Sequence, residues 1–131
     1  MATFEDLRAI KGHGTLLDKL VPVPTARLEA IRKRFGEAPS DYMSFLEMVG
    51  AGELGESAFM LYDGLVQPED VYGDAPSLKG VLLLGDDLQG FNAAFDTKDW
   101  SVVEIDPTNM RKNHLAPTFE SFIRRKLEVI A

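Results

Sequence analysis

The fold is decided by residues 81–105, whose sequence is VLLLGDDLQGFNAAFDTKDWSVVEI. Three short apolar runs, at 81–84, 91–95 and 100–105, have the length of β-strands. The two segments between them are rich in Gly and Asp and are short enough to be hairpin loops. Consecutive strands joined by short loops pair antiparallel, so this stretch predicts a meander sheet.

The pattern continues on both sides of this stretch. Residues 58–62 predict a further strand, residues 68–72 predict one helical turn, and residues 74–77 predict a loop. The residues between Asp106 and Thr118 lack a clear period, and we interpret them as an irregular connection.

The clearest helix begins after Pro39, where four apolar residues recur with the spacing of one helix face: Tyr42, Phe45, Leu46 and Val49. Ser40 is expected to cap its first N–H groups, and Asp41 suits the positive end of the helix dipole. Gly50 is expected to end the helix in a left-handed conformation.

Three other segments predict helices. Residues 3–10 predict a short helix, and residues 25–35 predict an amphipathic helix with Thr25 as cap, a basic outer side and Gly36 as its end. A last helix is expected after a cap at Thr118, with one apolar face: Phe119, Phe122, Ile123 and Leu127.

These elements predict one α+β domain over residues 1–131. We expect two layers, with an antiparallel meander of about four to six strands packed against N-terminal helices and a C-terminal helix. A chain of 131 residues is long enough for a single core.

The charge of the chain is concentrated in its middle. Residues 41–110 contain two basic and fourteen acidic side chains, a net charge of −12, whereas the two flanking segments are basic and bring the total to −7. Such an asymmetry attracts a basic partner and speeds its encounter. It argues against nucleic acid as the partner, because binding to phosphates needs clustered Lys and Arg. A solvated surface that keeps the protein soluble is the simpler alternative.

Composition also indicates the compartment. The chain has no cysteine, which favours a reducing environment. Its first residues, Met1-Ala2-Thr3-Phe4-Glu5-Asp6, are acidic where a signal peptide would be basic, and no apolar run is long enough to span a membrane. We therefore expect a cytoplasmic protein without membrane contact.

Three motifs resemble nucleotide-binding, metal-binding or catalytic sites, but none has the residues or the context that such a site requires. Residues 50–55 match G-x-G-x-x-G but follow a predicted helix and precede a strand, the reverse of a dinucleotide site, so we interpret them as a helix-terminating loop. Asp86 and Asp87 lack the further ligands of a calcium loop, and His13 and His114 lack metal-site spacing. We expect no catalytic residue, cofactor or metal, and hence no enzyme.

The candidate contacts with a protein partner are chosen for acidity and for their predicted position in loops or at strand edges: Glu53, Glu56, Asp63, Asp86, Asp87 and Phe91. Phe91, Trp100 and Tyr62 are aromatic residues on predicted strands, where one sheet face can be exposed. An aromatic residue surrounded by acids suits the centre and rim of an interface.

Three blocks of the sequence, in this order, resemble the SUKH superfamily, which includes bacterial immunity proteins and fungal cell-wall-synthesis regulators. Residues 38–50 are similar to its Leu-Pro, aromatic, Phe-Leu and Asn-Gly pattern, with Ala38 and Val49 as departures. Residues 82–96 are similar to its strand, Gly-Asp turn, Gly and strand signature, and residues 118–123 to the start of its last helix.

The resemblance implies an α+β domain without catalysis. For a bacterial protein it further implies an immunity protein that binds and neutralises a toxin, often a nuclease with a basic surface. A regulatory or structural interaction domain, and a small-molecule-sensing domain with a pocket between sheet and C-terminal helix, remain as alternatives. The sequence does not decide between a monomer and a dimer.

Overall fold

The computed structural model describes residues 4–36 and 38–130. In chain order the elements are α1 (Glu5–Ile10), α2 (Thr25–Phe35), α3 (Ser40–Met48), β1 (Gly52–Leu54), β2 (Phe59–Val66), α4 (Glu69–Tyr72), a 3-10 helix (Pro76–Leu78), β3 (Val81–Asp86), β4 (Asn92–Asp96), β5 (Ser101–Asp106), β6 (Arg111–Ala116) and α5 (Phe119–Ile130). Thr3, where the first helix was expected to begin, lies outside the described residues.

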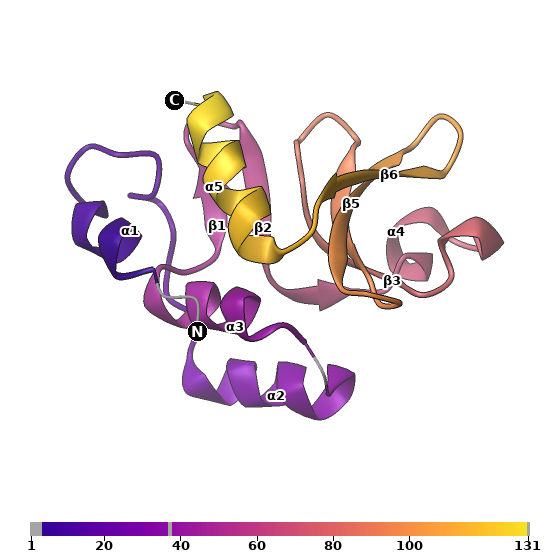
Figure 1. The fold of residues 1–131 in the computed structure, drawn as a ribbon, viewed down its shortest axis with the longest axis horizontal. Helices are drawn as coiled ribbons and strands as arrows, with labels where there is room; N and C mark the ends of the chain where they lie inside the picture. Colours follow the sequence, from indigo (N-terminus) through magenta and orange to yellow (C-terminus); the bar gives the residue numbers. More distant parts are fainter. Residues whose placement is uncertain (1–3, 37, 131) are drawn as a thin grey trace.

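The strands of the described residues form one six-stranded sheet, and their spatial order follows their order in the chain (Figure 1). Every neighbouring pair is antiparallel. This arrangement confirms the predicted α+β fold, with a meander sheet between N-terminal helices and a C-terminal helix.

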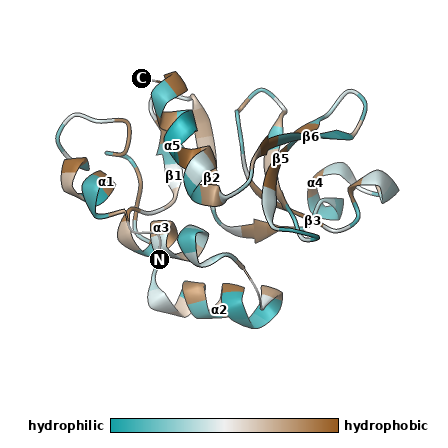
Figure 2. Ribbon diagram, viewed as in Figure 1, coloured by the Kyte–Doolittle hydropathy of each residue, from teal (hydrophilic) through white to brown (hydrophobic). Residues whose placement is uncertain are grey.

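One face of the sheet packs against α1, α2, α3 and α5. The main buried cluster joins side chains from all four helices to the inward side of the strands, and Figure 2 shows hydrophobic residues along this contact. At its centre the rings of Phe4, Tyr42, Phe45 and Phe119 meet largely edge to face, with centroids 5.1–6.5 Å apart. Such contacts add stability beyond the area they bury.

The opposite face, here called the back face, is covered only in part. Residues 67–80, which contain α4 and the 3-10 helix, pack over the middle strands in a second buried cluster that includes Leu78 and Leu83. This cluster reaches β2 through Tyr62 and Val66, and among the described residues it includes none from β1. The helix layer and the sheet therefore form the two expected layers, and the back face stays open beside β1 and β2.

Two strands were not predicted. β1 lies inside the glycine-rich segment that we interpreted as a loop. Because it is only three residues long, it is too short to show the alternation of apolar and polar residues that indicates a strand. β6 is an edge strand whose first four residues, Arg111–His114, are exposed on both sides, and it is hydrophilic in Figure 2. Charged side chains commonly protect the edge of a sheet, and they erase the hydrophobic pattern.

Two hairpin loops, between β4 and β5 and between β5 and β6, share one construction. In each, the carboxylate of an aspartate, Asp96 or Asp106, accepts a hydrogen bond from the N–H two residues further on, at 3.1 and 2.9 Å. Each loop ends in a left-handed residue, Trp100 at φ 59° and Met110 at φ 57°. The side chains of both residues pack against a buried cluster, which offsets the roughly 1 kcal/mol cost of that conformation.

The first turns of α3 and α5 meet at Asp41. One oxygen of its carboxylate accepts the N–H of Tyr42 at 2.8 Å, and the other accepts the N–H of Glu120 at 2.9 Å. Ser40, which we expected to cap α3, is its first residue and makes no capping hydrogen bond, and Thr25 behaves in the same way in α2. The cap predicted at Thr118 is confirmed, because its hydroxyl accepts the N–H of Ser121 at 3.1 Å.

We expect the substitution Asp41→Ala to lower the free energy of unfolding by about 1–2 kcal/mol, because it leaves a helix N–H without its acceptor. Urea denaturation followed by circular dichroism measures the change. Glu47→Ala is the matched control, since Glu47 is an exposed residue of the same helix, and surface substitutions usually change stability by less than about 0.5 kcal/mol. Equal losses in the two variants would contradict the role assigned to Asp41.

Candidate functional site

A row of side chains crosses the back face from β1 to β4. Glu53 pairs with Met60, Met60 with Asp86, and Asp86 with Asn92. Directly paired residues point to the same side of a sheet, and adjacent strands lie about 4.8 Å apart. The carboxylates of Glu53 and Asp86 therefore share the back face, two strands apart, with Met60 between them.

Beside this row lies a shallow hollow of about 360 Å³, here called the apolar hollow. Its main lining residues come from the segment before α2 and from β2: Val21, Pro22, Pro24, Met60, Tyr62 and Asp63. Val21 is 68% exposed, an unusual value for a large apolar side chain. The hollow thus offers an apolar surface next to the exposed carboxylate of Asp63.

The close approach of two chain segments builds one wall of this hollow. Val21 and Ala51 exchange both backbone hydrogen bonds, at 2.9 and 3.0 Å, so residue 21 extends the sheet beyond β1. Gly50 makes the approach possible, because a Cβ atom there would lie 2.3 Å from the carbonyl carbon of Val21, and its φ of 119° also favours glycine.

A chain of hydrogen bonds, here called the tyrosine–asparagine network, connects the hollow to α4. The hydroxyl of Tyr72 donates to Oδ1 of Asn92. Nδ2 of Asn92 donates to the hydroxyl oxygen of Tyr62 at 3.0 Å and to the carbonyl of Gly85 at 2.9 Å. The hydroxyl of Tyr62 in turn donates to Asp86 at 2.6 Å. Asn92 is only 4% exposed, so the network satisfies a buried polar group.

Burial and the neighbouring carboxylates raise the pKa of both tyrosines. Burial raises the pKa of Tyr62, and the hydrogen bond to Asp86 raises it further. Burial and the negative charges of Asp86 and Asp87 raise the pKa of Tyr72. Near neutral pH both hydroxyls are therefore hydrogen-bond donors rather than phenolate nucleophiles or bases.

Of the residues predicted as contacts, Glu53, Asp63 and Asp86 lie around the apolar hollow. The carboxylate of Glu53 is 2.7 Å from the ammonium of Lys19, and this hydrogen bond lowers the pKa of Glu53. The carboxylate of Asp63 is 3.6 Å from the guanidinium of Arg27, and both side chains are largely exposed. Asp86 uses one oxygen for Tyr62 and belongs to the network.

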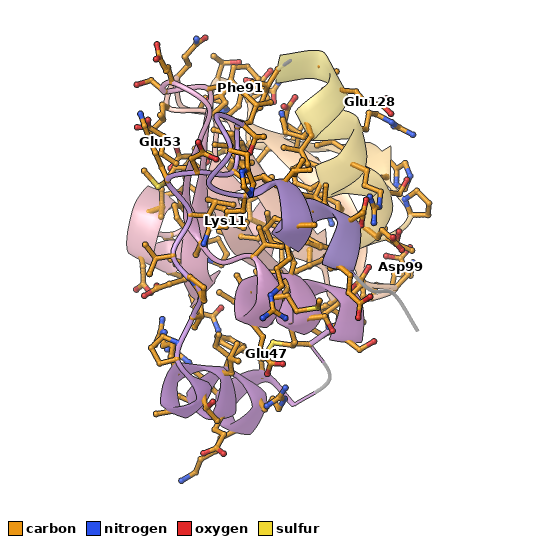
Figure 3. All side chains as sticks on the ribbon, turned by 90° about the vertical axis from the view of Figure 1, so that its left-hand side faces the viewer. Lys11, Glu47, Glu53, Phe91, Asp99 and Glu128 are labelled. Atoms are coloured by element: carbon orange, nitrogen blue, oxygen red, sulfur yellow. The ribbon has the colours of Figure 1, made fainter. Side chains whose placement is uncertain are left out.

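The other three lie in turns at one end of the sheet. Asp87 stabilises its own loop, because one oxygen of its carboxylate accepts the N–H groups of Gln89 and Phe91 at 2.8 and 3.1 Å. Phe91 is partly exposed, and Glu56 is exposed in the β1–β2 turn. β1 and β3 run in the same direction, so both turns lie at the same end, near the labelled Glu53 and Phe91 in Figure 3.

The acidic residues of the middle segment do not form one patch. At least six of the fourteen accept hydrogen bonds from backbone N–H groups in turns or at a helix end: Asp41, Asp86, Asp87, Asp96, Asp99 and Asp106. Figure 3 shows Glu53, Glu47 and Asp99 on separate parts of the surface. Turn formation therefore accounts for much of the −12 charge, and the candidate site rests on the few acids beside the hollow.

Sequence reasoning missed Leu88 and Val21. Leu88 is 46% exposed at the tip of the β3–β4 loop, in a left-handed conformation at φ 63°. Its only signal is an apolar residue in the middle of an Asp-Asp-Leu-Gln-Gly turn. Val21 lies in a Val-Pro-Val-Pro segment, whose pairing with β1 no local pattern indicates.

Among residues 4–36 and 38–130 no three His, Cys, Asp or Glu side chains lie where they could hold a metal ion. In the same ranges, none of the helices has the length and apolar character needed to cross a membrane.

No family model matches this chain, and none of the curated proteins matches it significantly. The resemblance of its three sequence blocks to the SUKH superfamily therefore stays a prediction.

We expect Asn92→Ala to lower the free energy of unfolding by about 2–3 kcal/mol, because it removes the partner of the buried Gly85 carbonyl and of two tyrosine hydroxyls. Asn113→Ala, in the exposed strand β6, is the matched control and should change stability by less than about 0.5 kcal/mol. Urea denaturation measures both. A loss in the Asn92 variant no larger than in the control would show that the network is not a stabilising unit.

Proposed function

We propose that this chain is a non-catalytic domain that binds the basic surface of a protein partner through the apolar hollow and the carboxylates around it. The observation that carries the proposal is the combination of an exposed apolar surface with the exposed carboxylate of Asp63 in its lining and with Glu53 and Asp86 on the adjoining back face.

The apolar part supports protein binding because of its position. Val21, Met60 and the two prolines form a floor that the other described residues, within 4–36 and 38–130, leave uncovered. Interfaces between proteins commonly have such an apolar centre, from which water is excluded, and a polar rim that fixes orientation. Leu88 presents a further apolar group at the end of the neighbouring loop.

The carboxylates around the apolar hollow support the proposal that the partner is basic. The ion pairs of Glu53 with Lys19 and of Asp63 with Arg27 involve basic side chains that are 58% and 48% exposed. Exposed pairs of this kind contribute little to stability, so a cation from a partner can replace or join Lys19 and Arg27 at small cost. The net charge of −7 would speed the encounter with such a partner at low salt.

The sequence resemblance makes the proposal more specific. An immunity protein of the SUKH superfamily would act in the cytoplasm and neutralise a toxin by covering its functional surface. A nuclease toxin has a basic surface for its substrate, and an acidic domain can occupy that surface. Tyr62 donates a hydrogen bond to Asp86, and the other oxygen of Asp86 accepts the N–H of Leu88, so these side chains fit a rigid binding surface better than a reactive centre.

Co-expression with the toxin encoded beside its gene tests this function. We expect a complex that survives purification, rescue of growth, and an affinity that falls as salt screens the charges. The absence of both complex and rescue would refute the immunity role.

Charge reversal tests the location of the site. We expect Asp63→Lys to weaken the complex roughly tenfold or more, because it places a cation against the basic surface of the partner. Glu128→Lys makes the same change of charge on α5, on the side of the molecule opposite Glu53 in Figure 3, and should leave affinity nearly unchanged. Calorimetric titration measures the dissociation constants of the partner complexes of both variants. Equal weakening would indicate a general charge effect rather than this surface.

A further inference from the structure

A second hollow of the described residues lies elsewhere and shares no lining residue with the apolar hollow. It has a volume of about 800 Å³, within the range of small-molecule sites. Its large apolar lining residues are all aliphatic: Leu7, Ile10, Leu16, Leu17 and Leu127. We call it the aliphatic groove. It lies between α1, the loop after α1, the β1–β2 turn and α5, on the side that faces the viewer in Figure 3.

The floor and one wall of the groove are fixed. Leu7 and Leu17 belong to the buried core and form the floor. The loop wall is held by Asp18, whose carboxylate accepts the N–H groups of Gly12, Gly14 and Thr15 at 2.7–3.2 Å. A groove that exists before binding loses little entropy when a ligand enters it.

The rest of the wall connects this loop to the sheet. The N–H of Gly55 in the β1–β2 turn donates to the carbonyl of Leu16 at 3.0 Å. Ile10, at the outer edge, is 45% exposed, so an apolar ligand gains contact with a side chain that water otherwise surrounds. The groove is therefore open and apolar rather than a sealed gap in the core.

The shape and chemistry of the lining favour an alkyl chain. The groove residues include no aromatic ring against which a flat ligand could stack. Flexible aliphatic walls instead suit a flexible aliphatic ligand.

The charges at the mouth select the head group. Lys19 is the basic side chain of the lining, and its ammonium already lies 2.7 Å from Glu53. Asp18 and Glu56 also line the groove, so carboxylates outnumber ammonium groups at its mouth. An anionic head group would be repelled there, whereas a neutral one is tolerated and a cationic one is attracted.

We propose that the aliphatic groove binds the alkyl chain of a neutral or cationic amphiphile. This site goes beyond the proposed protein-binding surface, because its apolar lining comes from other elements. It would make the domain a sensor of an amphiphilic small molecule in addition to a binder of protein.

The test uses the full chain and three probes with the same dodecyl chain: dodecyltrimethylammonium, dodecyl maltoside and dodecanoate. Each is titrated below its micelle concentration and followed by calorimetry. We expect saturable binding of the cationic and neutral probes, and binding of dodecanoate weaker by about fivefold or more, because like charges near the mouth repel it. Failure of all three probes to saturate, or tightest binding of dodecanoate, would overturn the proposal.

Variants locate the site. We expect Ile10→Gln to lower the affinity for the cationic and neutral probes by about fivefold, because it removes part of the apolar contact between the groove and the alkyl chain. Val71→Gln is the matched control on α4, where Val71 is 50% exposed, and should not change the affinity. Equal effects of the two substitutions would place the alkyl chain outside the groove.

Glu56→Lys tests the head group. We expect this substitution to increase the affinity for dodecanoate and to decrease the affinity for dodecyltrimethylammonium, while the affinity for dodecyl maltoside stays unchanged. A parallel change of all three probes would contradict the charge argument. Asp63→Lys, in the apolar hollow, should leave all three affinities unchanged, which separates this site from the protein-binding surface. A loss of probe binding in that variant would show that the two surfaces are not independent and would refute the assignment.

Discussion

The carboxylate of Asp41 accepts hydrogen bonds at the beginnings of two helices that are 79 residues apart in the sequence, α3 and α5. A helix N-terminus has unpaired N–H groups and a partial positive charge, so two such ends repel each other when they meet. One anion between them reverses this repulsion. The rings of Tyr42 and Phe119 lie 5.3 Å apart beside it, so the polar contact fixes the geometry in which the aromatic centre packs.

This arrangement places the main helices on one face of the sheet and thereby determines what the other face can do. Among the described residues, residues 67–80 and Met110 cover the middle strands of the back face in a buried cluster that includes no residue of β1. The apolar hollow is a part that the described residues leave uncovered, and its outer wall exists because Val21 pairs with Ala51. The candidate surface is thus a consequence of the incomplete cover of the back face.

Local patterns could predict the elements that have one apolar face or a continuous apolar run. The helical spacing of Tyr42, Phe45 and Leu46 predicted α3, and the apolar run at residues 81–84 predicted β3. β6 was not visible, because an edge strand with Arg111 and Lys112 exposed carries no apolar period. The contact of Asp41 with Glu120 and that of Val21 with Ala51 depend on the tertiary arrangement, so no window of sequence contains them.

The acidic composition has two physical origins, and only the structure separates them. An aspartate that accepts backbone N–H groups, such as Asp87 or Asp106, would be selected by its turn whether or not a partner exists. Asp63 has no such role, since its carboxylate contacts only the exposed Arg27 at 3.6 Å among the contacts of the described residues. A charge that local structure does not require, beside an apolar surface that the fold leaves open, is a stronger sign of binding than net charge. By this criterion Asp63 and the apolar hollow, rather than the acidic segment as a whole, are where a partner should be sought.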